Sequence, residues 1–323
     1  MDQRNGFSGV LLVLAAGVLW GTVGPAQVLA DSPAPPVTLG AARILSGGLL
    51  LAALVLATAP RAFRGLGGPA RLPLLAAAAA TGTFQAAFLT AVDRTGAAVA
   101  TAIVFGLVPV STGVCERLVL RTRLSRRWAA GTACAVGGCA LLMVPGLTGA
   151  LDPLGLALAL VGGCCFGVYT VSAKILGERG VNMAAAVAVT LLAGGALLLP
   201  WALHGAAELA GGRSLALVAW LGPATTAVAY MCFVIGLRRV TAATAGTLSL
   251  AEPLVAAVLA LAVLGERLSA ATTAGCLLLL GGLVLVSVPG RVRPFRRPRR
   301  SARVCLPDAT GAVKVETTTG ERS

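Results

Sequence analysis

The feature that most constrains this chain is a series of ten apolar runs. They occupy approximately residues 9–30, 36–58, 72–91, 96–118, 128–146, 153–173, 183–203, 214–236, 241–264 and 270–288. About 20 apolar residues in a helix cross the roughly 30 Å of hydrocarbon in a bilayer. Because backbone polar groups inside a bilayer must be hydrogen-bonded within the chain, the runs predict helices. The expected fold class is an all-α polytopic membrane protein with ten transmembrane helices.

The composition agrees with a membrane protein. Hydrophobic residues make up 57% of the chain, charged residues make up 12%, and the mean hydropathy is +0.89. These values exclude an ordinary soluble domain. The net charge of +14 lies between the apolar runs and in the tail, without a basic face interleaved with aromatic residues, so no nucleic-acid partner is expected. The eight cysteines show no zinc-type spacing and are interpreted as small apolar residues, so no metal is expected.

The distribution of Lys and Arg sets the expected orientation, because cytoplasmic loops are enriched in both. With the N-terminus inside, 22 of the 26 Lys and Arg residues fall in cytoplasmic segments, three fall outside, and Arg43 falls within the second run. The first run is treated as a span and not as a cleaved signal peptide, since it is long and follows a nearly neutral segment. We expect a multi-pass protein of the cytoplasmic membrane with both termini in the cytoplasm.

The C-terminal tail, residues 289–323, is strongly basic. Seven arginines lie between Arg291 and Arg303, directly after the last run. A basic cluster in this position attracts anionic lipid of the inner leaflet at about 1 kcal/mol per residue. The tail is therefore expected to contact anionic lipids, and its remaining polar sequence is expected to be disordered.

The chain contains an internal repeat. A shift of 144 residues aligns 97–144 with 241–288 without a gap and gives 14 identities in 48 positions. The pairs include Pro109 with Pro253, Arg123-Leu124-Ser125 with Arg267-Leu268-Ser269, Gly131 with Gly275, and Gly137-Gly138 with Gly281-Gly282. Shifts of 146 and 147 align Trp20 and Gly21 with Phe166 and Gly167, and Gly47-Gly48 with Gly194-Gly195. Residues 9–146 and 153–288 are thus interpreted as two five-span units between a short N-terminal segment (1–8) and the tail.

Because five is an odd number, the second unit is expected to enter the membrane from the opposite side. The two units would then be related by an axis in the membrane plane. Secondary transporters use such inverted repeats, since one structure can open to either face around a site near the midplane. The alternative is a duplicated membrane scaffold that transports nothing.

Glu252 and Pro253 lie near the middle of the ninth run. An ionised side chain in lipid is costly, so an acid at this depth usually faces a cavity, a partner or a transport path. Pro253 has no backbone N–H to donate to the carbonyl of Ser249, so a helix break is expected here and at its repeat mate Pro109. The alternative for Glu252 is a protonated acid that only stabilises a helix contact.

These features together resemble the drug/metabolite transporter superfamily, specifically its EamA-type branch. The resemblance covers about residues 9–288 and rests on the ten spans, the paired halves, Trp20-Gly21, Pro109, Glu252-Pro253 and the segment Leu264 to Ser269. It implies a central cavity lined by spans 1–4 and 6–9, and movement of small organic molecules, usually outward. The first unit departs from the pattern, since Val108 stands in the place of Glu252 and Arg121-Thr122-Arg123 in the place of Gly265-Glu266-Arg267. A mechanism with a symmetric pair of acids is therefore not expected.

Polar and aromatic residues at membrane depth are the candidates for a substrate cavity. They are Trp20, Arg43, Gln85, Phe88, Tyr169, Tyr230, Thr247 and Ser249. Arg43 keeps its charge, so it either faces water, a carboxylate or an anionic substrate, or it snorkels to the membrane surface. The others offer hydrogen bonds or aromatic faces to a ligand, or they serve packing. Glu252 is the candidate coupling residue, because a carboxyl group can carry a proton.

The expected function is secondary transport. A small organic metabolite or drug-like compound would be exported across the cytoplasmic membrane by alternating access, with proton coupling through Glu252. The alternatives are a facilitative or uptake permease of the same fold and a non-transporting scaffold. The sequence has no ATP-binding, nucleophile-elbow or metalloprotease motif, so no enzyme, catalytic residue or cofactor is expected.

Overall fold

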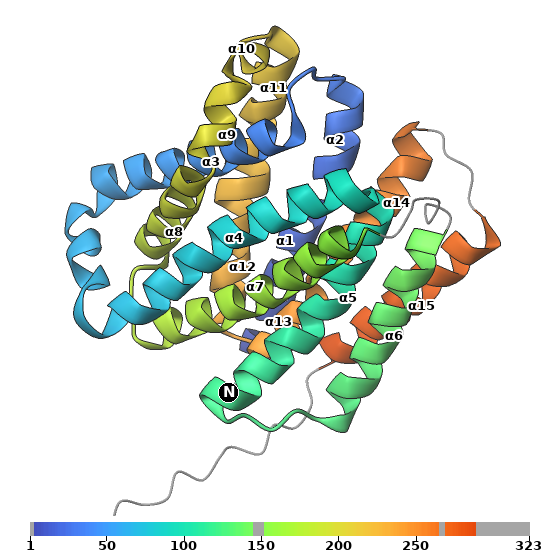
Figure 1. Cartoon of the computed structure of the whole chain (residues 1–323). Coiled ribbons are helices and arrows are strands. Elements are labelled where there is room, and N and C mark those ends of the chain that lie inside the picture. Colours follow the sequence, from blue (N-terminus) through green and yellow to red (C-terminus); the bar gives the residue numbers. More distant parts are fainter. Residues whose placement is uncertain (1–2, 145–151, 265–268, 289–323) are drawn as a thin grey trace, which may run out of the picture. The chain divides into compact units, whose positions relative to one another are not determined.

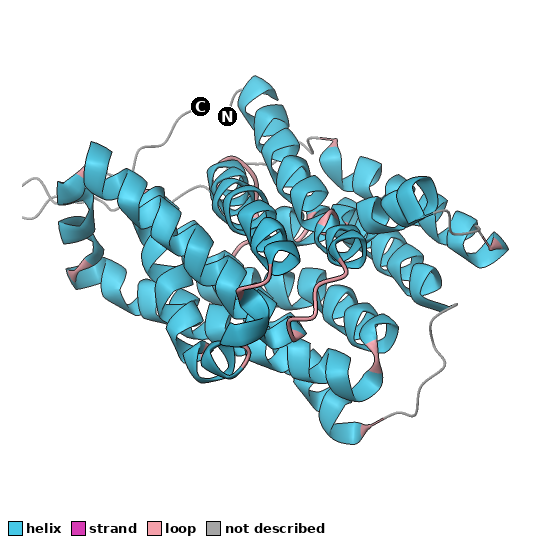
Figure 2. Cartoon of the chain, turned by 90° about the horizontal axis from the view of Figure 1, so that it is seen from above, coloured by secondary structure: helices cyan, strands magenta, loops and turns pink. Residues whose placement is uncertain are grey.

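The computed structural model describes residues 3–144, 152–264 and 269–288. These residues form helices joined by turns, without a β-strand among them (Figure 1, Figure 2). The basic tail and its predicted contact with anionic lipids lie outside the described residues, as does Glu266.

The helices follow the apolar runs of the sequence. In the first half they are α1 (Gln3–Gly21), α2 (Val23–Ala30), α3 (Pro36–Thr58), η1 (Pro60–Leu66), η2 (Gly68–Ala70), α4 (Arg71–Thr95), α5 (Ala97–Cys115), the π-helix η3 (Glu116–Leu120) and α6 (Arg126–Met143). In the second half they are α7 (Pro153–Glu178), α8 (Met183–Leu197), α9 (Leu199–His204), α10 (Ala206–Leu209), α11 (Gly212–Trp220), the π-helix η5 (Leu221–Val228), α12 (Ala229–Leu237), α13 (Ala242–Leu248), α14 (Ala251–Leu264) and α15 (Ala270–Ser287).

Eight helical segments of the described residues are long and apolar enough to cross a membrane. They are Gly6–Ala30, Pro36–Thr58, Gly68–Thr95, Ala97–Leu120, Pro153–Glu178, Gly212–Leu237, Ala242–Val263 and Ala270–Ser287. The other two predicted spans are helical as well, but α6 begins with two arginines and α8 has only 15 residues. The chain is therefore a multi-pass membrane protein, and its described residues contain eight candidate spans.

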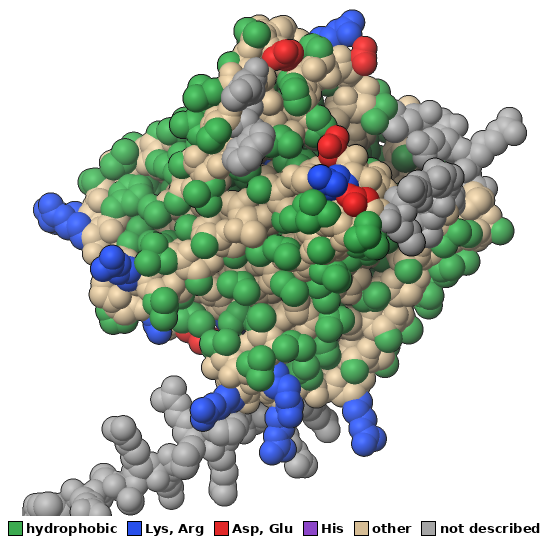
Figure 3. Space-filling model, viewed as in Figure 1, with side chains coloured by type: hydrophobic (Ala, Val, Ile, Leu, Met, Phe, Trp, Pro, Cys, Tyr) green, Lys and Arg blue, Asp and Glu red, His purple; other side chains and the backbone are tan. Residues whose placement is uncertain are grey.

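The surface has the polarity that a bilayer requires. Hydrophobic side chains spread across the face shown in Figure 3, while most of the visible Lys and Arg lie at its lower and left edges and most of the Asp and Glu in its upper half. Large apolar side chains such as Leu72 and Leu118 are 78% and 72% exposed. An apolar surface of this extent on a soluble monomer is unusual, and contact with lipid explains it.

The serine of the repeated Arg-Leu-Ser sequence caps the last helix of each half. Ser125 accepts a hydrogen bond from Trp128 N at 3.0 Å before α6, and Ser269 accepts one from Thr272 N at 3.0 Å before α15. A serine at this position satisfies a backbone donor that the first turn leaves free. The sequence identity between the halves thus has a local structural cause.

The helices α6 and α15 pack closely against each other, side by side in Figure 1. Glycines at repeat-related positions make this approach possible. A Cβ atom on Gly282 would lie 2.6 Å from the carbonyl oxygen of Gly131, and one on Gly275 would lie 2.9 Å from that of Gly138. Small residues allow membrane helices to pack with their backbones in contact.

Three of the ten predicted spans are interrupted. The seventh breaks at Leu198 between α8 and α9. The first breaks at Thr22 between α1 and α2, and the ninth breaks at Ser249 and Leu250 between α13 and α14. The predicted break beside Pro253 therefore occurs, and the Ser249 carbonyl that Pro253 cannot reach accepts a hydrogen bond from Glu252 N at 3.0 Å. The break at Thr22 lies three residues before Pro25, whose missing N–H has the same effect on the carbonyl of Gly21.

The predicted break at Pro109 was wrong. Pro109 lies inside α5, which continues from Ala97 to Cys115. Thr112 donates from Oγ1 to the carbonyl of Val108 at 2.7 Å, and Ser111 donates to the carbonyl of Gly163 on α7 at 2.7 Å. Such side-chain bonds and packing against neighbouring helices let a transmembrane helix continue through a proline.

Candidate functional site

A cavity of about 760 Å³ lies among the helices. Its walls come from α1, α2, α3, α4, α5, α7, α12 and α14, and the ends of α6 and α15 border it. Volumes of about 300–1,000 Å³ are typical of small-molecule sites. The cavity is therefore large enough for a small organic molecule.

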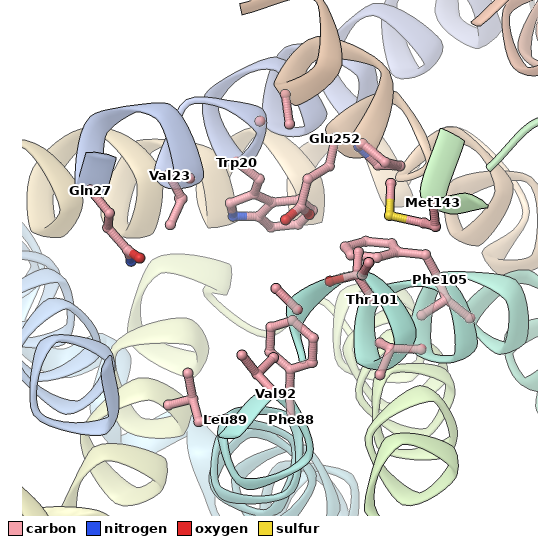
Figure 4. A pocket seen from close by; sticks show the side chains of 18 of the residues that line it. Trp20, Val23, Gln27, Phe88, Leu89, Val92, Thr101, Phe105, Met143 and Glu252 are labelled. Atoms are coloured by element: carbon pink, nitrogen blue, oxygen red, sulfur yellow. The ribbon is translucent and has the colours of Figure 1, made fainter. Parts of the chain in front are cut away.

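Aromatic side chains from four helices form one wall. Trp20 lies 5.5 Å from Tyr230 and 6.3 Å from Phe166 between ring centroids, and Tyr169 lies 5.7 Å from Tyr230, all edge to face. Phe84 of α4 meets Phe166 edge to face at 6.2 Å, and Phe88, which stacks on Phe84 at 5.7 Å, lies across the cavity from Trp20 (Figure 4). Edge-to-face and offset contacts stabilise aromatic pairs, so this wall is a packed and preorganised surface.

Two opposite charges enter the cavity from different helices. Glu252 projects from α14 beside the ring of Trp20, with Phe88 and Thr101 on the opposite wall (Figure 4). Arg43 projects from α3, where its Nη2 lies 3.5 Å from Oε1 of Gln85. Among the described residues, ion pairs within 4.0 Å join only Arg94 to Asp152 and Arg213 to Asp31. The guanidinium and the carboxylate therefore line one cavity without neutralising each other directly.

The hydroxyl group of Tyr169 is a further polar group at the cavity. It is buried and has no hydrogen-bond partner in the structure. A buried polar atom without a partner is costly, and its presence beside a cavity points to a ligand or water that satisfies it. Tyr169 thus adds a hydrogen-bonding group near Tyr230.

Six of the eight predicted cavity residues line the cavity. They are Trp20, Arg43, Gln85, Phe88, Tyr169 and Tyr230. The predicted coupling residue Glu252 and its neighbour Pro253 also line it, whereas Pro109 is buried in α5.

The prediction that Thr247 and Ser249 line the cavity is corrected. Thr247 is fully buried, and its Oγ1 lies 2.8 Å from Oγ1 of Thr132, which joins α13 to α6. Ser249 is also fully buried and donates to the carbonyl of Gly246 at 2.8 Å. Both hydroxyls are therefore satisfied by hydrogen bonds within the helix packing and do not line the cavity.

Cavity residues near the helix ends were missed by the sequence analysis. Gln27, Thr101 and Met143 line the cavity from α2, α5 and α6 (Figure 4). Pro25 could have predicted the helix break that places Gln27 at the cavity. It is a proline within an apolar run, shortly after Trp20-Gly21. Thr101 and Met143 carried no such signal, because neither residue type is unusual in a span.

The cavity reaches one end of the helices. Val28 and Val92 lie near the ends of α2 and α4, and Pro36 and Ala97 lie at the starts of α3 and α5. The opposite ends of α3, α4 and α5 contribute none of the described lining residues. The cavity thus extends from the middle of the helices toward a single side.

The sequence matches the model of the EamA-like transporter family twice, over residues 7–144 and 153–288. The chain belongs to the EamA-like transporter family. It is 34% identical over 283 residues to the uncharacterized transporter YwfM of Bacillus subtilis (strain 168), covering 87% of this chain and 94% of YwfM. It is 32% identical over 272 residues to the uncharacterized protein PA1977 of Pseudomonas aeruginosa, covering 83% of this chain and 90% of that protein.

A solved crystal structure shares the fold. It superposes with a TM-score of 0.74 at 22% sequence identity and covers 86% of this chain and 96% of its own. At this identity the likeness concerns the fold alone. The family match and the relative named as a transporter make this EamA family member a membrane transporter.

Proposed function

We propose that this EamA family member is a secondary transporter that exports a small organic metabolite or drug-like compound by alternating access. The observation that carries the proposal is the cavity that holds an unpaired Arg43 and an unpaired Glu252 against an aromatic wall. Such a lining suits an amphiphilic compound, since aromatic rings contact its apolar part and Arg43 binds an anionic group. Glu252 supplies a carboxyl group that takes up and releases a proton, which supports proton-coupled transport. The chain's own residues offer no catalytic motif, so we propose no enzymatic activity.

We propose that the two halves are related as inverted repeats and that the chain spans the membrane ten times. Contacts between the two halves occur in matching pairs. In each pair, the position that belongs to the first half in one contact is taken by its repeat counterpart from the second half in the other, as a twofold axis between the halves produces. The matching pairs are Gly17 with Ala251 and Gly163 with Leu107, and Gly21 with Val255 and Gly167 with Ser111. The shifts of 146 and 144 residues found in the sequence relate each pair to its counterpart. With five spans in each half, the axis lies in the membrane plane.

The basic loops favour a cytoplasmic location for both termini. In that orientation, the ends of α2 and α4 and the starts of α3 and α5 lie on the extracytoplasmic side, where the cavity reaches the helix ends. The conformation described here is then open to the outside. Release of an exported compound takes place from such a state.

Counterflow in proteoliposomes tests the proposed function. A thermal-shift screen of metabolites and amphiphilic drugs on the purified protein first selects compounds that bind, since a ligand of the folded state raises its stability. Vesicles loaded with an unlabelled selected compound should then take up the labelled compound transiently above equilibrium. A scaffold would show no counterflow with any binder, and an imposed pH gradient separates proton-coupled export from facilitated movement.

A further inference from the structure

A second pair of charged residues lies at the helix ends opposite to the cavity mouth. Glu116 follows α5 and is only 2% exposed, and its Oε2 accepts a hydrogen bond from Ala243 N at 2.6 Å. Lys174 of α7 donates from Nζ to the carbonyls of Leu237 and Val240, each at 2.8 Å. Lys174 is also attracted through space by Glu178 and by Glu116. We call Glu116 and Lys174 the clamp, because both hold the short connection between α12 and α13.

The clamp has no charged counterpart on the cavity side. Under the shifts of 144 and 146 residues, Glu116 corresponds to Ala260 and Lys174 corresponds to Val28. Both counterparts are apolar, and both line the cavity. Ala98, which corresponds to Ala242 at the start of α13, lines it as well. Equivalent positions of the two halves are therefore joined by buried and partly buried polar contacts at one end and separated by the cavity at the other.

The helix breaks follow the same asymmetry. The segments that carry Val28 and Ala260 are α2 and α14, and each is separated from the rest of its span by a break. Their repeat counterparts are the second part of α7, which is continuous to Glu178, and the end of α5 with η3. A break gives a segment freedom to change direction, whereas the clamp holds its counterpart in place.

We propose that the clamp is the cytoplasmic gate of this transporter. While Glu116 and Lys174 hold the α12–α13 connection, the cytoplasmic side stays shut and the cavity stays open to the outside. Opening to the cytoplasm requires these hydrogen bonds to separate, and it accompanies closure of α2 and α14 over the cavity mouth. The clamp favours the outward-open state through contacts that the inward-open state lacks. This inference rests on the proposed alternating access and identifies the residues that control it.

The gate is tested by the accessibility of Cys165, which lines the cavity on α7. In a variant that keeps Cys165 as its only cysteine, a membrane-impermeant thiol reagent is applied from either side of sealed vesicles of known orientation. Hydrogen bonds to charged groups are each worth about 1.5–3 kcal/mol, so Glu116→Gln with Lys174→Met should shift the ratio of the two labelling rates by about tenfold or more. Compared with the parent protein, the double variant should be labelled relatively faster from the side on which the parent protein is labelled more slowly. Arg117→Gln, an exposed change next to Glu116, should leave the ratio unchanged.

An unchanged ratio in the folded double variant would overturn the proposal. This readout needs no substrate, so it fails independently of the proposed transport activity. If the double variant does not fold, a Glu116→Cys, Ala243→Cys pair in a background free of other cysteines replaces it. A short bifunctional thiosulfonate reagent that joins the pair should stop counterflow until a reductant cleaves it, while the untreated protein transports. Counterflow that persists in the joined protein contradicts the gate.

Discussion

Replacement of Glu252 by Gln should abolish the response of substrate accumulation to a pH gradient. Glu252 carries the only carboxyl group among the described residues that line the cavity, so the site binds at most one proton in each cycle. A pH difference of about one unit is worth about 1.4 kcal/mol per proton, which corresponds to about a tenfold concentration ratio. The wild-type protein should therefore concentrate its substrate up to about tenfold per pH unit, and the Gln variant should not concentrate it at all.

The assay is substrate accumulation in proteoliposomes with an imposed pH gradient and the membrane potential held at zero. Gln has nearly the size of Glu and keeps its hydrogen-bonding capacity, so equilibrium exchange should persist in the variant. Glu208→Gln, the same substitution at an exposed position of α10, is the matched control and should accumulate substrate like the wild type. Accumulation by Glu252→Gln at the wild-type level would refute the coupling role. Accumulation far above tenfold by the wild type would require a second proton site.

Three further predictions concern substrate binding, helix packing and orientation. Arg43→Gln should weaken substrate binding by about 1.5–3 kcal/mol and Arg43→Lys by less, as read from transport kinetics; unchanged kinetics at normal expression would favour snorkelling. Gly138→Ala should destabilise the protein by about 1–3 kcal/mol in thermal unfolding, because its Cβ would lie 2.7 Å from the carbonyl oxygen of Gly275. Gly137→Ala, whose Cβ meets nothing closer than 3.6 Å, should not, and equal losses would contradict the packing argument. A cysteine label near Gly67 should react from the cytoplasm and one near Gly211 from outside, and labelling from one side only would remove the inverted orientation.

The sequence was sufficient to predict the helices and the centre of the cavity. Membrane-length apolar runs leave the backbone no alternative to helices, so each of the ten runs is helical. Glu252 was found because a carboxylate within an apolar run is too costly to face lipid. The same reasoning identified Arg43. Trp20 and Tyr230 followed from their place in those spans, and the structure brings them within 5.5 Å of each other.

Other parts of the site depend on contacts between distant helices, which periodicity does not encode. Thr247 is polar at membrane depth like the cavity residues, but its partner Thr132 is 115 residues away in the chain. Lys174 was counted only as a basic residue of a cytoplasmic segment and Glu116 was not singled out, since nothing in the sequence shows that each reaches the connection between α12 and α13. At Pro109 the sequence predicted a break that does not occur, because contacts with neighbouring helices can keep a helix continuous through a proline.

The central claim is that the cavity beside Trp20 and Glu252 is the path of the substrate. Ala256 and Val258 lie two residues apart on α14, but Ala256 lines the cavity, whereas Val258 is 50% exposed on the apolar surface. Counterflow of a compound selected by thermal shift should be lost in Ala256→Trp, because the indole fills the cavity, and should be retained in Val258→Trp. Undiminished counterflow in folded Ala256→Trp protein would contradict the claim.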